Sequence, residues 1–162
     1  MVRLKRLCAA AALAAFASLA TSGLHAKTLR WASASDIPSW DIHSQNNALA
    51  NGIHAAVYES LFYYNSRSFA LEPQLATGYR QLSPTQVRVT LRRGVKFHDG
   101  AAFDADDAVF SIERAMAKSS NFGVYTQGID RVVKVDDYTV DILTKGPNPV
   151  LLRQLTELRM MD

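Results

Sequence analysis

The sequence predicts a mixed α/β domain in which hairpin-linked strands pack beside amphipathic helices. Residues 87–91 alternate apolar and polar side chains, the period of two that is typical of a strand with one buried face. Residues 104–118 open with acidic residues and continue with apolar residues at helical spacing. Two further strand-like segments, 131–135 and 138–143, flank an Asp-Asp turn. Helices and paired strands in one short chain indicate an α/β or α+β fold.

Several weaker elements are expected before the strand at 87–91. Residues 28–33 form a short strand candidate, which Pro38 prevents from continuing as a ladder. A helix is predicted from residue 47 to residue 64, followed by a loop that starts at residues 71–73 and a weak strand at 78–82. The helix prediction depends on apolar residues that recur every four positions, at Leu49, Ile53, Val57 and Leu61.

The second half of the chain contains stronger local signals. A turn at residues 98–100 ends in a glycine, which can supply the positive φ that such turns require. Asp104 is expected to cap the helix that follows, and Asp107 adds negative charge near the positive end of the helix dipole. Residues 119–128 are predicted to be a loop. Asn148 is expected to cap a last helix, which carries Leu151, Leu155 and Leu158 on one face.

The N-terminal region has the layout of a secretory signal peptide. A basic start at residues 1–6 is followed by an uncharged apolar run at 7–20 and by small residues before Lys27. The run is shorter than the roughly 20 apolar residues that a helix needs to span a bilayer. We therefore expect residues 1–26 to be a signal peptide that is cleaved after Ala26, and the product to be periplasmic.

Removal of this segment changes the net charge and the cysteine content of the mature chain, and with them the classes of function that are excluded. The chain has 18 Lys and Arg against 15 Asp and Glu, and the three basic residues among the first six leave with the signal, so the mature chain has no net charge. Nucleic acid is therefore excluded as the ligand. Cys8, the single cysteine, also lies in the signal. It precedes most of the apolar run, so lipid attachment is not expected, and the mature chain has no thiol for a disulfide, a zinc site or a nucleophile.

The remaining chain shows no constellation of residues for catalysis or metal binding. The acids at 104–107 open a helix and lack the spacing of a calcium loop. His98 and Asp99 are adjacent on a turn, and His43 and His54 are isolated from one another in sequence. We expect no catalytic residue, no metal site and no cofactor. A periplasmic hydrolase would need catalytic residues beyond the end of this chain.

Residues 91–114 closely resemble the signature of one family. The segment LRRGVKFHDG, followed by FDADDAVFSIER, matches the L-R-x-G-V-K-F-H-D-G and F-T-A-x-D-V pattern of the bacterial extracellular solute-binding proteins of family 5. These are the peptide- and nickel-binding receptors of ATP-binding-cassette importers. Asp104 replaces the usual Thr, and Asp caps a helix as well as Thr does. Other pieces of the family pattern occur in the same order, at residues 39–43, 57–61, 71–76 and 138–149.

The resemblance implies a partial two-lobed periplasmic binding protein fold. Residues 27–44 would begin lobe I, and residues 45–162 would form most of a subdomain added to that lobe, incomplete at its C-terminus. The second lobe would be missing. The family implies a small peptide as ligand, a monomeric full-length protein and an inner-membrane permease as partner. A nickel chelate, haem, a sugar or an opine is the alternative ligand within the family.

The resemblance also suggests where this fragment would touch its ligand. The family places contacts in the loop after residues 39–43, and the alternative role for that loop is a helix cap. A second contact would come from an aromatic residue after the signature helix, either Phe122 or Tyr125, and the alternative is that these aromatic residues cover the core. The signature itself is expected to be structural. The expected loop contacts are Ser44, Gln45, Asn46, Asn47 and Ala48.

Overall fold

The computed structural model describes residues 28, 30, 32, 33 and 35–162. The chain divides into two compact units, Met1–Asp36 and Ile37–Asp162. The predicted signal peptide lies outside the described residues.

The described residues of the first unit form neither helix nor strand. The strand predicted at 28–33 is therefore wrong at its four described positions, and positions 29 and 31 lie outside the described residues. The prediction depended on composition alone, and no pairing partner joins the described positions in a ladder.

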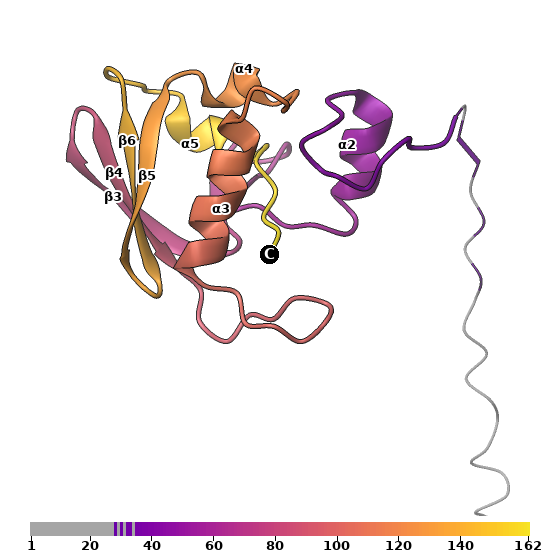
Figure 1. Ribbon diagram of the computed structural model, residues 1–162, viewed down its shortest axis with the longest axis horizontal. Coiled ribbons are helices and arrows are strands. Elements are labelled where there is room, and N and C mark those ends of the chain that lie inside the picture. Colours follow the sequence, from indigo (N-terminus) through magenta and orange to yellow (C-terminus); the bar gives the residue numbers. More distant parts are fainter. Residues whose placement is uncertain (1–27, 29, 31, 34) are drawn as a thin grey trace, which may run out of the picture. The chain divides into compact units, whose positions relative to one another are not determined.

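The second unit contains a four-stranded antiparallel sheet, in the order β3-β4-β6-β5 (Figure 1). The strands are β3 (Ala76–Ser83), β4 (Gln86–Leu91), β5 (Ile129–Asp136) and β6 (Thr139–Thr144). The sequence predicted all four of them, the first three with shorter bounds and the last one shifted by one residue. The turn at residues 137–138 joins β5 directly to β6, whereas β4 and its neighbour β6 are separated along the chain by two helices and β5.

The alternation in β4 divides its side chains between two faces, as the sequence predicted. Val87, Val89 and Leu91 are buried, and they lie in the core beneath the sheet. Arg88 lies on the opposite face, where its Nε donates to Asp141 Oδ1 of β6 at 2.7 Å. One face of the sheet is therefore apolar and packed, and the other is polar.

Helix α3 (Ala105–Met116) covers the apolar face of the sheet and buries the side of the helix that carries Ala108 and Ile112. Its predicted N-cap is confirmed. Asp104 Oδ1 accepts a hydrogen bond from the Asp106 backbone N–H at 2.8 Å, and Asp107 Oδ2 accepts one from the Asp104 N–H at 2.8 Å. These bonds satisfy N–H groups that have no partner within the helix.

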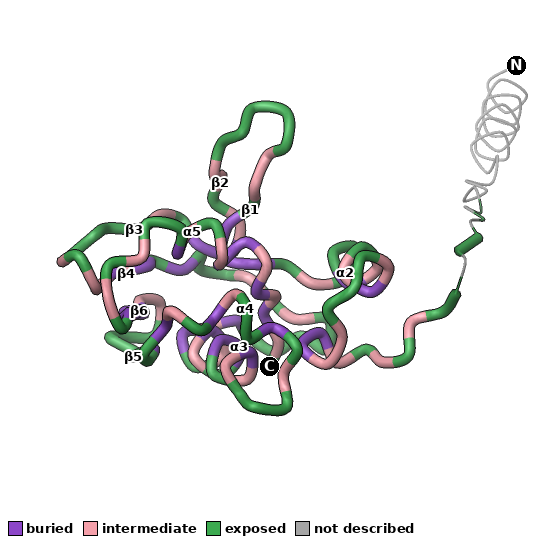
Figure 2. The backbone as a smooth tube through the Cα atoms, turned by 90° about the horizontal axis from the view of Figure 1, so that it is seen from above, coloured by how far each residue is buried: buried purple, intermediate pink, exposed green. Residues whose placement is uncertain are grey.

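The helix predicted at 47–64 is wrong in its second half. Helix α2 spans only Ala48–His54, and the chain then turns and enters strand β1 (Phe62–Tyr64). β1 pairs antiparallel with β2 (Leu71–Pro73), which the sequence analysis treated as the start of a loop. Leu61 and Phe62 are buried in the core, and the segment that carries them is extended and not helical. The hairpin projects from the neighbouring elements (Figure 2).

Two short helices complete the unit. α4 (Gly123–Thr126) lies within the segment predicted to be a loop. α5 (Leu151–Gln154) begins after Val150, and not directly after Asn148 as predicted. Asn148 Oδ1 instead accepts from the Val150 N–H at 3.3 Å, which forms a turn before the helix. Leu151, Leu155 and Leu158 are all buried, but the predicted helix that would carry them on one face is wrong, because α5 ends at Gln154 and the other two leucines follow it.

Candidate ligand-binding surface

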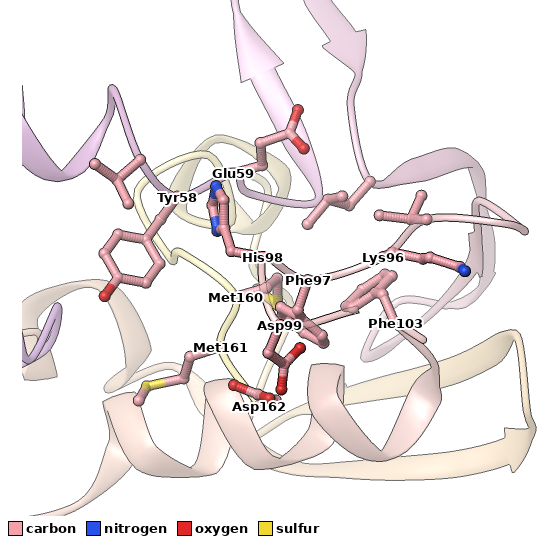
Figure 3. A pocket seen from close by; sticks show the side chains of 13 residues that line it. Tyr58, Glu59, Lys96, Phe97, His98, Asp99, Phe103, Met160, Met161 and Asp162 are labelled. Carbon is pink, nitrogen blue, oxygen red and sulfur yellow. The ribbon is translucent and has the colours of Figure 1, made fainter. Parts of the chain in front are cut away.

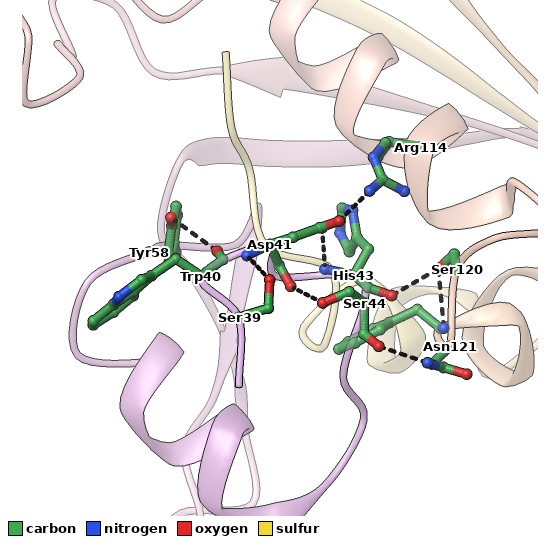
Figure 4. A network of polar contacts seen from close by, with 10 residues as sticks. Ser39, Trp40, Asp41, His43, Ser44, Tyr58, Arg114, Ser120 and Asn121 are labelled. Atoms are coloured by element: carbon green, nitrogen blue, oxygen red, sulfur yellow. Dashed lines mark hydrogen bonds and ion pairs between the residues drawn. The ribbon is translucent and has the colours of Figure 1, made fainter. Parts of the chain in front are cut away.

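The predicted ligand loop begins in a tight turn that Asp41 organises (Figure 4). The Asp41 N–H donates to Ser39 Oγ at 3.0 Å, and Asp41 Oδ1 accepts from the His43 N–H at 3.1 Å. The Asp41 carbonyl accepts from both the N–H and the hydroxyl of Ser44, at 3.1 and 2.8 Å. One aspartate therefore fixes the backbone immediately before the loop residues.

The same aspartate joins the loop to the signature helix. The guanidinium of Arg114, near the end of α3, forms an ion pair with the second oxygen of the Asp41 carboxylate, 73 residues away in sequence (Figure 4). About 27% of the Arg114 side chain and 31% of the Asp41 side chain are exposed. The contact therefore lies at the edge of the core.

The loop after α3 makes a second connection to the ligand loop. The Asn121 N–H and the Ser120 hydroxyl both donate to the His43 carbonyl, at 2.9 and 3.3 Å. Asn121 Nδ2 donates to the Ser44 carbonyl at 2.6 Å. The structure thus brings together the two segments that the sequence analysis proposed as ligand contacts, although 77 residues separate them (Figure 4).

The two asparagines of the loop already have roles within the chain. Asn47 is the N-cap of α2 and accepts from the Ala50 N–H at 3.0 Å. Asn46 Nδ2 donates to the Asn121 carbonyl at 3.2 Å, and Asn46 Oδ1 accepts from Asn51 Nδ2 at 3.0 Å. The alternative role, capping of a helix, therefore applies to Asn47. Ligand contact by either residue stays a prediction.

The remaining loop residues differ in what they offer to a ligand. Ser44 is half-buried and uses its hydroxyl in the turn. Gln45 is half-buried and makes no side-chain hydrogen bond to the part of the chain that the structure describes. Ala48 is exposed at the first position of α2. Gln45 is therefore an amide of this loop that can turn to a ligand without breaking a hydrogen bond.

The two candidate aromatic residues have different surroundings. Phe122 is only 3% exposed, with its ring edge-on to His43 at 5.4 Å and tilted against Tyr125 at 5.6 Å between ring centroids. Tyr125 is half-buried. Phe122 therefore covers the core, which was the alternative role, and Tyr125 is the aromatic residue that retains surface for a ligand.

The side chain of His43 packs against Phe122 of this aromatic pair. The side chain is fully buried, and burial lowers its pKa from 6.5 to about 4, with the positive charge of Arg114 adding to the effect and Asp41 opposing it. The imidazole is therefore neutral at pH 7. A neutral ring in contact with Phe122 acts as packing and supplies no charge to the surface above it.

A separate hollow of about 330 Å³ lies beside the signature segment (Figure 3). Phe97, Phe103 and Met160 gather on one side of it, and Glu59 and His98 lie at its rim. Among the described residues, no group of three or more His, Cys, Asp or Glu side chains is placed to hold a metal ion. The lining residues are Val57, Tyr58, Glu59, Leu75, Val95, Lys96, Phe97, His98, Asp99, Phe103, Met160, Met161 and Asp162.

Comparison with known proteins agrees with the pattern of the signature segment. Residues 70–161 match the family described as bacterial extracellular solute-binding proteins, family 5 Middle. The chain belongs to this family. No helix within the described residues has the length and apolar character needed to cross a membrane.

Several family 5 relatives resemble this chain. The glutathione-binding protein GsiB of Salmonella typhimurium is 31% identical over 141 residues, which cover 85% of this chain and 26% of that protein. The crystal structure of NikZ from Campylobacter jejuni in complex with Ni(L-His) is 26% identical, with a TM-score of 0.69, and the match covers 79% of this chain and 26% of NikZ. AppA from Bacillus subtilis, in complex with a nonapeptide, is 24% identical with a TM-score of 0.67, over 75% of this chain and 24% of AppA. AppA shares the fold, and this chain spans about a quarter of the length of each relative.

Four residues that hold the candidate surface of this family 5 chain together were not among the predicted contacts. Asp41, Arg114, Ser120 and Asn121 make the contacts that join the ligand loop to the α3 region. Asp41 lies in the recognised segment at residues 39–43, and Arg114 is the last residue of the signature match. The shared motifs were therefore visible in the sequence, but not the contact between them.

Proposed function

We propose that this chain is part of the solute-capturing component of an ATP-binding-cassette importer, and that the solute is a small peptide. Membership of family 5 supports the first part. The relative GsiB is named for binding glutathione, which is itself a tripeptide, and this supports the second. The observation that carries the proposal is the pair of hydrogen bonds that joins Ser44 and Asn46 of the 44–48 loop to Asn121, shortly before helix α4, which carries Tyr125.

The chemistry of this surface suits a peptide backbone. Amide and hydroxyl groups can donate to and accept from the backbone of an extended peptide, whatever its side chains are. In this proposal Gln45 supplies such an amide, and Ser44 and Asn46 border it. Tyr125 supplies an apolar ring face with a polar hydroxyl, which can cover a side chain of the bound peptide.

The proposal extends to the cell biology of the whole protein. Residues 1–26 would direct export and would be removed, which leaves a monomeric protein in the periplasm. Two lobes would close on the peptide by a hinge motion, and the closed form would dock on an inner-membrane permease. In this mechanism the protein binds its solute and breaks no bond in it.

Mass spectrometry of small molecules that copurify with the full-length protein is the direct test. We expect short peptides, and we expect isothermal titration with trialanine and with reduced glutathione to give saturable binding by at least one of them. Liquid chromatography should recover both peptides intact after long incubation. Cleavage of either peptide would favour a hydrolase and contradict the proposal.

A metal chelate is the second candidate, because the structure of NikZ contains Ni(L-His) and is 26% identical to this chain. Titration with Ni(II) and L-histidine together would distinguish the two candidates. Saturable binding of the chelate, with no binding of either peptide, would replace the peptide proposal.

A further inference from the structure

We infer that Arg114 is a positioning residue for the ligand loop, and that it acts through Asp41. This inference deepens the proposed function and rests on it for the role of the loop. The signature helix would then have a task beyond building the subdomain, because its last matched residue holds the segment that presents the loop to the solute.

Asp41 binds a different partner with each of its two carboxylate oxygens. One oxygen accepts from the His43 N–H at 3.1 Å, and the other receives the Arg114 guanidinium. The carboxylate can hold the His43 amide only when its own orientation is fixed. The ion pair to α3 supplies that fixed point, because Arg114 lies on a helix that is packed against the sheet.

The turn at Asp41 also fixes the position of the residues that follow it. The Asp41 carbonyl receives the N–H and the hydroxyl of Ser44, so Ser44 is held at two atoms. Gln45 follows directly, and the α2 N-cap is two residues further on. A change in the orientation of Asp41 would therefore move the start of the ligand loop and leave α2 in place.

The partial exposure of the Asp41–Arg114 pair allows a positioning role to be distinguished from a role in folding. Solvent reaches both side chains of the pair and screens their attraction, which reduces what the pair contributes to global stability. Loss of the pair should therefore loosen the turn locally and leave the sheet and its core unchanged. A residue needed only for folding would affect both regions together.

Amide hydrogen exchange on the full chain tests the inference without a ligand. In Arg114→Gln, we expect the His43 and Ser44 amides to exchange at least tenfold faster than in the parent, with unchanged protection in β4 and β6. Arg114→Lys keeps the positive charge and should restore most of the protection. Arg131→Gln is the matched control, because Arg131 forms an exposed ion pair with Asp130 at 2.8 Å outside this turn, and it should leave both amides unchanged.

Two exchange results would overturn the inference. Unchanged exchange at His43 and Ser44 in Arg114→Gln would mean that the bonds from Ser120 and Asn121 hold the loop without the ion pair. Faster exchange of similar size throughout the sheet would mean that Arg114 acts on global stability.

Binding of reduced glutathione and trialanine is measured separately on the same variants. If the parent binds either peptide, Arg114→Gln should weaken that binding about threefold to tenfold, and Arg114→Lys should recover most of the loss. Unchanged affinity in Arg114→Gln would contradict the positioning role. If the parent binds neither peptide, the peptide proposal fails, while the exchange result still decides whether Arg114 orders the loop.

Discussion

The sheet with its covering helix and the ligand loop are held together by different forces. The sheet buries apolar side chains such as Val89, Val140 and Ile142 against α3. The ligand loop is held by hydrogen bonds and by the Asp41–Arg114 ion pair at the edge of the core. Apolar burial contributes more per residue than exposed polar contacts do. The loop can therefore change while the fold is retained.

The largest expected effect comes from a cavity in the sheet. Ile142 is fully buried and lies between Val87 and Val132 on the neighbouring strands. Ile142→Ala should lower the free energy of unfolding by about 2–5 kcal/mol, because the loss of burial and the new cavity both destabilise. Urea denaturation measures the change. Val133→Ala removes a half-exposed side chain from β5 and is the control. A similar loss in both variants would contradict the contrast between a buried core and a tolerant surface.

The buried histidine beneath the ligand surface should make stability depend on pH. His43 has a pKa of about 4 in the folded chain against 6.5 for the ordinary side chain, so the unfolded state binds the proton more strongly. The contribution of neutral His43 to the free energy of unfolding is fully present above pH 6.5. It decreases by about 2–3 kcal/mol as the pH falls towards 4.

Denaturation at a series of pH values between 7 and 4 checks this dependence. His43→Gln should flatten the pH profile in this window. The exposed His98 provides a matched control, and His98→Gln should keep the profile of the parent. An unchanged profile in His43→Gln would show that other groups cause the acid destabilisation.

The N-cap of α3 provides an effect of intermediate size. Asp104→Ala removes the acceptor for the Asp106 N–H and breaks the reciprocal bond with Asp107. The variant should lose about 0.5–2 kcal/mol of stability and should keep its ligand preference. Chemical denaturation and peptide titration separate the two properties. Asp130→Ala also removes a carboxylate, but from an exposed ion pair, and should change stability by less than about 0.5 kcal/mol. Unchanged stability with lost binding would make Asp104 a site residue.

The difference between the two regions also explains which features the sequence could predict. The strand alternation at 87–91 and the Asp104 cap depend on residues a few positions apart, and both are present in the structure. The helix predicted to continue to Tyr64 depended on an equally regular local pattern. It failed because Leu61 and Phe62 reach the core from an extended segment that enters β1, and not from a helix face. A local period cannot distinguish these two causes of burial.

The arrangement of the segments at the candidate surface could be predicted only in part, for the same reason. The family pattern identified the loop at 44–48 and the aromatic residues after α3, and the structure places these segments side by side. The pattern could not show that Phe122 is buried and Tyr125 only partly so, because Phe122 packs in the core and against His43, which lies in a distant segment. It could not show that Asn47 is committed to capping α2.

The smallest expected effects on stability lie in the ligand loop, where Gln45 and Asn47 should behave differently. Gln45→Ala removes an amide that makes no hydrogen bond to the described residues, so unfolding should change by less than about 0.5 kcal/mol. Asn47→Ala removes the N-cap of α2 and should cost about 1 kcal/mol. In the full-length protein, Gln45→Ala should weaken peptide binding several-fold, because a neutral hydrogen bond contributes about 0.5–1.5 kcal/mol.

Titration calorimetry and thermal melting of both variants measure this difference. Tyr125→Ala is expected to follow Gln45→Ala, with weaker binding and a small change in melting temperature. If Gln45→Ala and Tyr125→Ala both bind trialanine and glutathione as tightly as the parent does, these residues have no role in binding. The loop would then serve only to start α2, and the solute contacts would come from parts of the protein outside this chain.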